Sequence, residues 1–343
     1  MRYRTLNNLS GWIVFGISFA VYVSTLEPTA SMWDCSEFVA CAYKLQVSHA
    51  PGAPLFMIIA RLFTLLAGND VQKVAMMVNL LSATVSALTV MLLFWTITIL
   101  ANKAVHAGNN KEKGKIAIMI TAGFLGSLSF AFTDSFWFSA VEAEVYALSS
   151  FLTALVFWAI LRWKNHPDRV YASRWLLFIA FIMSISIGVH LLNLLVIPAI
   201  LYILLSRNKD SDKRTLLRSL VISIIVLGFM MLLFIPGIAR ISSVIDLFCV
   251  NMLNLPINSG LYITFAMLVL LLTLLLVRAV RRKNIIRQTT ILSLIFMIAG
   301  YTCYLSIMLR SQENISVDMN NPDNPFSLYH FLNREHYGSR PLL

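Results

Sequence analysis

Two carboxylates lie three residues apart in a polar segment near the N-terminus. Asp34 and Glu37 belong to the stretch EPTASMWDCSEFVACAYKLQVSHAPGAPLF, which follows a first apolar run. If residues 33–48 are helical, the two acids share a face with Lys44 and Ser48, because residues three or four apart lie on one side of a helix. A carboxylate on such a face can act as general base on a hydroxyl group. The competing interpretation is the solvated face of an amphipathic surface helix.

The same segment carries groups suited to holding an anion. His49 opens the sequence HAPGAP, and Arg61 lies in the apolar stretch that follows. Cations bind phosphate oxygens through short, charge-assisted hydrogen bonds. Together with the carboxylates, these residues predict a site where a base and a phosphate leaving group meet at one membrane face.

A second acidic segment reads SFWFSAVEAEVY and contains Glu142 and Glu144. On a helix, residues two apart point to opposite sides, so we expect at most one of these acids to face the first segment. The alternative interpretation is that both are interfacial charges within a belt of aromatic residues.

Three further polar residues are weaker candidates for binding substrate. His190 and Asn193 lie near the end of a short apolar run, and Arg240 falls in a predicted loop over 236–260. Arg240 can bind an anion or extend its charge out of the membrane. The sequence has no Gly-rich phosphate loop and no HExxH motif, and its four cysteines form no CxxC pair.

The composition indicates an integral membrane protein. The 343 residues are 58% hydrophobic and 13% charged, against roughly 25% charged in soluble domains. Their mean hydropathy is +0.76. Each long apolar run can cross a hydrocarbon core of about 30 Å. The apolar runs cover residues 10–26, 51–67, 74–101, 116–133, 145–161, 175–189, 191–205, 217–235, 261–277 and 288–309.

The distribution of charge predicts the topology. If 51–67 does not cross the membrane, the short loops on the side of the N-terminus hold 20 of the 27 Lys and Arg residues, and the other side holds 12 of the 16 Asp and Glu residues. Basic loops face the cytoplasm, so the net charge of +11 is explained without nucleic acid. An arginine inside a span is costly, and 51–67 is therefore predicted to be re-entrant or surface-lying.

These observations predict an all-α, polytopic fold with about nine transmembrane helices. The expected domains are a transmembrane domain over 1–309, with a first outer loop at 27–73 that contains surface helices, and an extracytoplasmic tail over 310–343. The tail is interpreted as the start of a truncated C-terminal region. We expect the protein in a bacterial inner membrane, with its site facing the periplasm.

The order of the motifs resembles a known family. WDCSEF, HAPGAP, SAVEAEVYALSSF, GVHLLNLL, LPINSG and the final NPFSLYHFLNREHYGSRPLL are similar to the family related to protein O-mannosyltransferases, long catalogued as a domain of unknown function. That family belongs to the GT-C superfamily of membrane glycosyltransferases. Ala50 stands where proline is commoner in the family. The resemblance implies a polyprenyl-phosphate-linked sugar donor and an acceptor, such as a protein hydroxyl, on the non-cytoplasmic face.

The resemblance also implies roles for the candidate residues. Asp34 would be the general base, and Glu37 and Glu144 would orient the acceptor. A divalent metal, if one is used, would be held by Asp34 and Glu144. His49 and Arg61 would hold the donor phosphate. The remaining residues expected to contact substrate are Lys44, Glu142, His190, Asn193 and Arg240.

Two rival functions belong to other classes: a transporter or flippase of lipid-linked sugars, and a non-catalytic membrane partner. A transporter places ionisable residues along a path through its spans, whereas the acids of this chain gather at one face.

Overall fold

The computed structural model describes residues 3–106, 112–166, 169–207 and 212–338, in which no strand is present apart from one isolated bridge between Val47 and Asp318. The chain is therefore all-α, as predicted. Its α-helices are α1 (Tyr3–Ser24), α2 (Cys35–Lys44), α3 (Pro54–Thr64), α4 (Val74–His106), α5 (Glu112–Ala131), α6 (Asp134–Val141), α7 (Val145–Lys164), α8 (Arg169–Ile187), α9 (Ile197–Leu205), α10 (Lys213–Phe229), α11 (Ile235–Leu253), α12 (Ser259–Arg281), α13 (Ile285–Tyr301), α14 (Leu305–Ser311) and α15 (Pro325–Leu332).

Seven helical stretches among the described residues are long and apolar enough to cross a membrane. They are 3–24, 71–105, 114–131, 145–164, 213–253, 259–281 and 285–311. Three shorter apolar stretches cover 54–67, 171–187 and 191–205. A polytopic membrane protein is thus confirmed. The predicted total of nine spans is reached only if the shorter stretches 171–187 and 191–205 also cross, and that total stays a prediction.

The helices form two compact units. The first comprises Met1–Lys44 and Phe56–Asp168, and the second comprises Leu45–Leu55 and Arg169–Leu343. This division differs from the predicted domains 1–309 and 310–343. It also places the segment around His49 in a different unit from Asp34 and Glu37, although the three residues are close in sequence.

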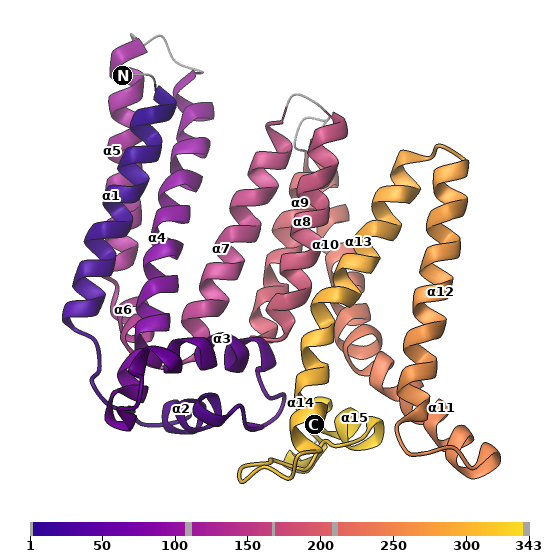
Figure 1. Ribbon diagram of the computed structural model, residues 1–343. Helices are drawn as coiled ribbons and strands as arrows, with labels where there is room; N and C mark the ends of the chain where they lie inside the picture. Colours follow the sequence, from indigo (N-terminus) through magenta and orange to yellow (C-terminus); the bar gives the residue numbers. More distant parts are fainter. Residues whose placement is uncertain (1–2, 107–111, 167–168, 208–211, 339–343) are drawn as a thin grey trace. The chain divides into compact units, whose positions relative to one another are not determined.

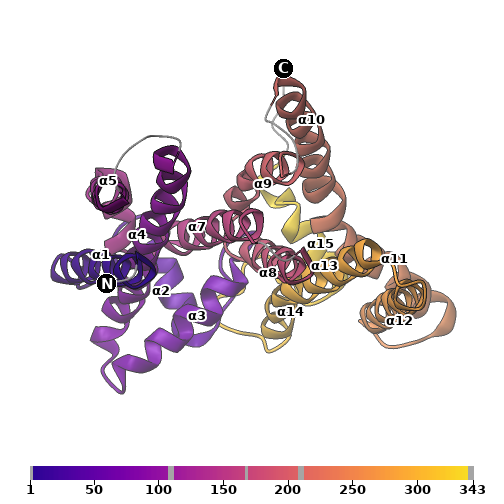
Figure 2. The same ribbon diagram turned by 90° about the horizontal axis from the view of Figure 1, so that it is seen from above.

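The first unit is built on α4, which packs against α1, α5 and α7 (Figures 1 and 2). Its core includes Tyr22, whose hydroxyl group donates to the carbonyl oxygen of Ala131 at 2.9 Å. A polar group left unpaired in this environment is costly, so this bond ties the end of α1 to the end of α5. The core residues are Val14, Tyr22, Ala83, Ala87, Val90, Phe94, Ala131, Phe136 and Ala140.

Two short helices lie crosswise to α1 and α4 near one end of them, as Figure 1 shows for α2 and α3. This is the orientation expected of a surface-lying helix over 51–67. The guanidinium group of Arg61, on α3, donates to the carbonyl oxygen of Tyr43 and to the hydroxyl group of Thr64. Arg61 therefore contacts protein groups, which removes the cost of an isolated charge in lipid.

In the second unit, α8 packs against α13, and α11 packs against α12 and α15. The predicted loop over 236–260 is wrong, because most of it is helix α11. The carboxylate of Asp246, 4% exposed, accepts from the backbone N–H groups of Gly260 at 2.7 Å and Asn258 at 3.2 Å. Asp246, whose charge favoured a loop in the sequence-based prediction, instead caps the start of α12, where backbone N–H groups lack helical partners.

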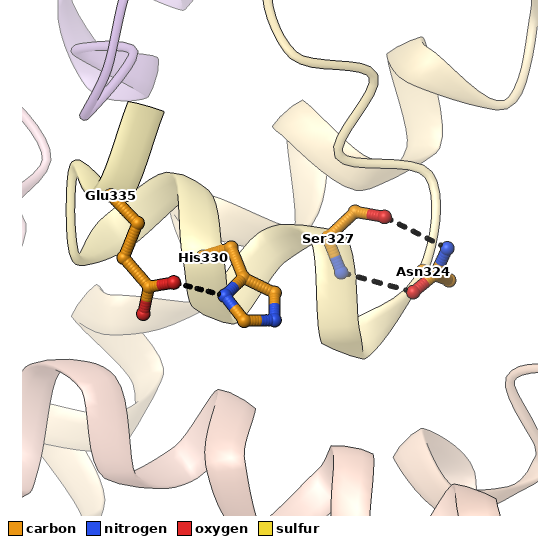
Figure 3. Close-up of polar contacts among 4 residues, drawn as sticks. All are labelled: Asn324, Ser327, His330 and Glu335. Atoms are coloured by element: carbon orange, nitrogen blue, oxygen red, sulfur yellow. Dashed lines mark hydrogen bonds and ion pairs between the residues drawn. The ribbon is translucent and has the colours of Figure 1, made fainter. Parts of the chain in front are cut away.

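The segment predicted as an extracytoplasmic tail is folded within the second unit, where α15 packs against α11. Asn324 caps α15, because its side-chain oxygen accepts from the N–H groups of Phe326 and Ser327; Figure 3 shows the contact with Ser327. At the other end, His330 Nδ1 lies 2.5 Å from a carboxylate oxygen of Glu335. The last described residues thus form an ordered continuation of the unit.

Candidate functional site

Asp34 stands at the start of α2. The backbone N–H of Phe38 donates to the carbonyl oxygen of Asp34 at 2.9 Å, and the helix begins at the next residue, Cys35. The side chain of Asp34 is exposed and that of Glu37 is half-buried. This position places the Asp34 carboxylate beside backbone N–H groups that lack partners within the helix.

The helix predicted over 33–48 is shorter than expected. It ends at Lys44, and Leu45 has a positive φ of 49°, a backbone conformation that costs a non-glycine residue roughly 1–2 kcal/mol. Lys44 remains exposed at the end of α2. Ser48 does not lie on the helical face, because its hydroxyl group donates to the carbonyl oxygen of Gly52 at 3.0 Å in the second unit.

The two acidic segments meet within the first unit. The hydroxyl group of Ser31 donates to a carboxylate oxygen of Glu142 at 2.7 Å. The thiol of Cys35 lies 4.0 Å from a carboxylate oxygen of Glu144. Both glutamates are buried, with 8% and 7% exposure, and their partners lie on either side of Asp34 in the sequence. The structure therefore gathers the acids of both segments at one end of this unit.

The expectation that at most one of Glu142 and Glu144 faces the first segment is wrong. It assumed a helix, but α6 ends at Val141, α7 begins at Val145, and both glutamates have extended backbones. The N–H of Glu144 donates to the carbonyl oxygen of Glu142 at 2.9 Å, and in this non-helical turn both side chains reach the first segment, where they contact Ser31 and Cys35. Glu144 also caps α7, because its carboxylate accepts from the N–H of Val145 at 3.1 Å.

The buried carboxylates Glu142 and Glu144 affect the pKa of the neighbouring Cys35 thiol. Burial, with a smaller contribution from the charges of Glu142 and Glu144, raises the pKa of Cys35 to about 11. Cys35 is therefore protonated at neutral pH and acts as a hydrogen-bond donor to a carboxylate, not as a nucleophile. Cys41, on the same helix, has its pKa raised to about 12 by burial and by Glu37.

Asn79 was not among the sequence candidates, yet it positions the first acidic segment. This residue of α4 is 1% exposed, and its amide donates to the carbonyl oxygens of Glu27 at 2.6 Å and Thr29 at 3.0 Å. The N–H of Glu27 in turn donates to the carbonyl oxygen of Val141 at 3.2 Å. A polar amide inside an apolar span was the signal for this role, since such groups need partners in the membrane.

The cationic candidates of the first unit are engaged by protein. Besides its hydrogen bonds, the guanidinium group of Arg61 lies 5.8 Å from the centre of the Tyr43 ring, a distance at which a cation is attracted to an aromatic face. Arg61 thus fastens α3 to the end of α2. A role for Arg61 or Lys44 in binding a donor phosphate stays a prediction.

His49 belongs to a segment of the second unit that is held by backbone contacts. Arg310 donates to the carbonyl oxygen of Leu45 at 2.7 Å, and Arg334 donates to that of Ala50 at 3.1 Å. The carbonyl oxygen of His49 accepts from the N–H of Gly52 at 2.8 Å. Two arginines of the C-terminal part therefore flank the HAPGAP turn, which the sequence alone did not indicate.

The second unit contains three further candidates for binding substrate: His190, Asn193 and Arg240. His190 Nδ1 accepts from the N–H of Leu192 at 3.2 Å, and burial, followed by the charge of Arg334, lowers the pKa of His190. A neutral imidazole is a poorer anion ligand than an imidazolium. The buried amide of Asn193 donates to the carbonyl oxygen of Ser186 at 3.3 Å. Arg240 is exposed on α11. Binding of substrate by these residues stays a prediction.

A divalent metal was expected, if anywhere, on Asp34 and Glu144. Both residues belong to the first unit, and carboxylate oxygens suit hard cations. Glu144 already accepts from the Val145 N–H and lies beside the Cys35 thiol. Within the same unit, a carboxylate oxygen of Glu37 lies within 4.8 Å of one of Asp34, so Glu37 is a further candidate ligand, and the metal itself stays a prediction.

The helices and the paired acidic segments define a polytopic, all-α membrane protein with buried carboxylates gathered at one end of its first unit. Comparison with known proteins makes the class specific. The protein O-mannosyl-transferase TMEM260 N-terminal domain family matches residues 34–214. This range is more than half of the chain, and the chain therefore belongs to that family.

Two named relatives support this membership. The chain is 30% identical over 213 residues to the mouse protein O-mannosyl-transferase TMEM260, in a match covering 60% of this chain and 27% of the relative. It is 21% identical over 201 residues to the protein O-mannosyl-transferase tmem260 of Dictyostelium discoideum, covering 55% and 22%. The match thus spans about a quarter of the length of these relatives. No solved structure matches the chain significantly.

The comparisons bear on the expected location as well. The chain is an integral membrane protein, but the relatives named above are eukaryotic, so the expectation of a bacterial inner membrane is not supported.

Proposed function

We propose that the chain is the membrane domain of a glycosyltransferase that moves a sugar from a polyprenyl-phosphate donor to a protein hydroxyl group on the non-cytoplasmic face. The names of the relatives point to mannose as the sugar. The donor and the membrane face come from the resemblance and from the distribution of charge, and they are part of the proposal.

One observation carries the proposal: the acidic segments of a chain in this family converge at one end of the first unit. Ser31 and Cys35 contact Glu142 and Glu144, and Asp34 lies between these two contacts in the sequence. Transfer to a hydroxyl group requires a base at the acceptor oxygen. Asp34 has the exposure for that role, whereas Glu142 and Glu144 are buried and already hydrogen-bonded.

In the proposed reaction, the acceptor oxygen attacks the anomeric carbon of the sugar. The bond from that carbon to the donor phosphate breaks, and the polyprenyl phosphate leaves with the bonding electrons. Asp34 takes the proton of the hydroxyl group. Glu37 and Glu144 orient the acceptor, and His49 with Arg61 stabilises the charge that develops on the phosphate.

The proposal is tested by following labelled mannose from polyprenyl-phosphate mannose to protein, in membranes of cells that express the full-length protein. We expect transfer above that of matched membranes without the protein. Labelled lipid that moves between leaflets, with no label reaching protein, would instead support the transporter. Absence of both activities would favour a non-catalytic partner.

The predicted membrane orientation has its own test. In a variant with Gly114→Cys, an impermeant thiol reagent is expected to label the new cysteine from the cytoplasmic side only, and in Ser135→Cys from the opposite side only. Both sites suit the measurement, because Gly114 has open space around it and Ser135 is exposed. The reverse pattern would show that 51–67 crosses the membrane and would place the two acidic segments on opposite sides of it.

A further inference from the structure

A polar cavity lies at the end of the first unit opposite to the acidic segments. Its volume is about 640 Å³. It is formed by the start of α1 and the ends of α4 and α7, whereas the acidic cluster lies beyond the end of α1 and before the start of α7. The lining residues are Tyr3, Arg4, Asn7, Asn8, Trp95, Thr98, Ile99, Asn102, Lys103, Trp158, Arg162 and Asn165.

The charge of this cavity has one sign. Three lining residues, Arg4, Lys103 and Arg162, are cationic and exposed, and none of the described lining residues is acidic. Three cations around one space repel one another unless an anion lies among them. The four asparagines and the threonine of the lining add neutral hydrogen-bonding groups. The cavity is therefore suited to a phosphate that carries hydroxyl groups.

The inner part of the cavity is aromatic. The ring centres of Trp95 and Trp158 are 6.1 Å apart, and the guanidinium group of Arg162 lies 5.7 Å from the Trp158 ring. The Trp95 indole N–H donates to the backbone carbonyl oxygen of Asn7 at 3.3 Å. This pair fixes Arg162 at the rim, because a guanidinium over a tryptophan face is attracted to it.

Asn7 supplies an observation that points to a ligand. Its side-chain oxygen is buried and has no hydrogen-bond partner among the described residues. A buried acceptor left unsatisfied is destabilising, so a donor at this position would stabilise the unit. Asn7 lines the cavity, so rotation of its side chain towards the cavity would let a hydroxyl group of a bound molecule supply that hydrogen bond while the phosphate contacts the cations.

Exposed apolar side chains beside the cavity indicate that the bound phosphate belongs to a lipid. Beside the cavity, α1 exposes Leu9, Trp12 and Ile13, and α4 exposes Leu100. These apolar side chains continue from the polar cavity along membrane-spanning helices, so acyl chains can lie against them while a head group occupies the cavity. Trp, Lys and Arg at such a helix end are also common at membrane interfaces, which is the simpler explanation that a test must exclude.

We propose that this cavity binds the glycerol-phosphate head group of an anionic phospholipid, held by Arg4, Lys103 and Arg162. The predicted topology assigns the site to the cytoplasmic leaflet. The inference is independent of the proposed sugar transfer, because it uses neither the acidic segments nor the second unit.

The test measures the thermal unfolding of the purified full-length protein in detergent micelles as phosphatidylglycerol is added. A ligand that binds the folded state raises the unfolding temperature, and phosphatidylcholine, which is zwitterionic, should raise it much less. Arg162→Ala should weaken the apparent affinity about tenfold or more, since hydrogen bonds to charged groups are worth roughly 1.5–3 kcal/mol. Lys103→Ala should weaken it similarly.

Arg174→Ala is the matched control. Arg174 is exposed in the first turns of α8, at the end of that helix predicted to face the cytoplasm, and its guanidinium group lies 4.6 Å from the centre of the Tyr171 ring, but it does not line the cavity. The Arg174→Ala variant should bind phosphatidylglycerol with the same affinity as the unmodified protein. Arg162→Lys, which keeps the charge, should recover part of the affinity and shows that a loss in Arg162→Ala is not misfolding.

Three results would overturn the proposal. Equal stabilisation by phosphatidylglycerol and phosphatidylcholine would leave only a general lipid effect. Equal weakening by Arg162→Ala and Arg174→Ala would show that the surface charge matters and the cavity does not. Saturation by free glycerol 3-phosphate at the same concentration as by the lipid would identify a soluble ligand, because the acyl chains would then contribute nothing.

Discussion

Asp34→Asn is expected to lower the rate of sugar transfer by about 10²–10⁴-fold, the usual contribution of a general base. Asparagine has nearly the same shape as aspartate but cannot take up the proton of the acceptor hydroxyl group. Because Asp34 is exposed at the start of α2, the change should disturb the fold less than a change at the buried Glu142 or Glu144. The measurement is transfer of labelled mannose in membranes, with binding of the donor measured in parallel.

Asp134→Asn is the matched control, since Asp134 is also exposed and also begins a helix of the first unit, α6. It should transfer sugar at the normal rate. If Asp34→Asn is normal while Glu37→Gln is inactive, the base is Glu37. If both single variants and the double variant are normal, the face of α2 is only solvated, and the proposed reaction loses its site.

The membrane architecture could be predicted because the bilayer leaves few choices. Backbone groups in lipid must be paired within helices, so a long apolar run already implies its structure. A different argument set 51–67 apart from the predicted spans: the distribution of charged residues, together with the cost of placing Arg61 inside lipid. In the structure protein groups receive this arginine, since Arg61 contacts Tyr43 and Thr64.

The details of the acidic segments could not be predicted in the same way. Whether Glu142 and Glu144 point together depends on whether the chain between α6 and α7 is helical or extended, and hydropathy does not decide this for three residues. The capping of α7 by Glu144 decides it, because the cap residue has an extended backbone. The helix α11 was missed for a related reason: Asp246 resembles a loop charge until its partners at Asn258 and Gly260 are known.

The contact between the two acidic segments predicts an unreactive thiol at Cys35. Burial and the charges of Glu142 and Glu144 raise its pKa from 9.0 to about 11. The thiolate is the reactive form, and each pKa unit lowers its fraction tenfold at pH 8. Alkylation of Cys35 in the folded protein should therefore be about 100-fold slower than that of an ordinary thiol, before the further protection that its 1% exposure gives. Mass spectrometry of the alkylated peptides measures this rate without any cysteine substitution.

The same shift has a consequence for stability. A thiol whose pKa is higher in the folded state than in the unfolded state favours folding while it is protonated in both. The contribution of Cys35 is thus complete below about pH 9 and is lost as the pH rises through 11. We expect the unfolding temperature to fall over this alkaline range.

A double variant, Glu142→Gln with Glu144→Gln, separates the charges from the burial. Glutamine keeps an oxygen that can accept from Ser31 and from the Val145 N–H, but it removes both negative charges, so the pKa of Cys35 should fall and its alkylation should accelerate. Burial is the largest cause of the shift, and the rate should therefore remain below that of the same peptide in denaturant. Rapid labelling of Cys35 in the unmodified protein, or no difference between it and the double variant, would mean that the two acidic segments do not meet. The proposed catalytic end of the first unit would then lack the contact on which it depends.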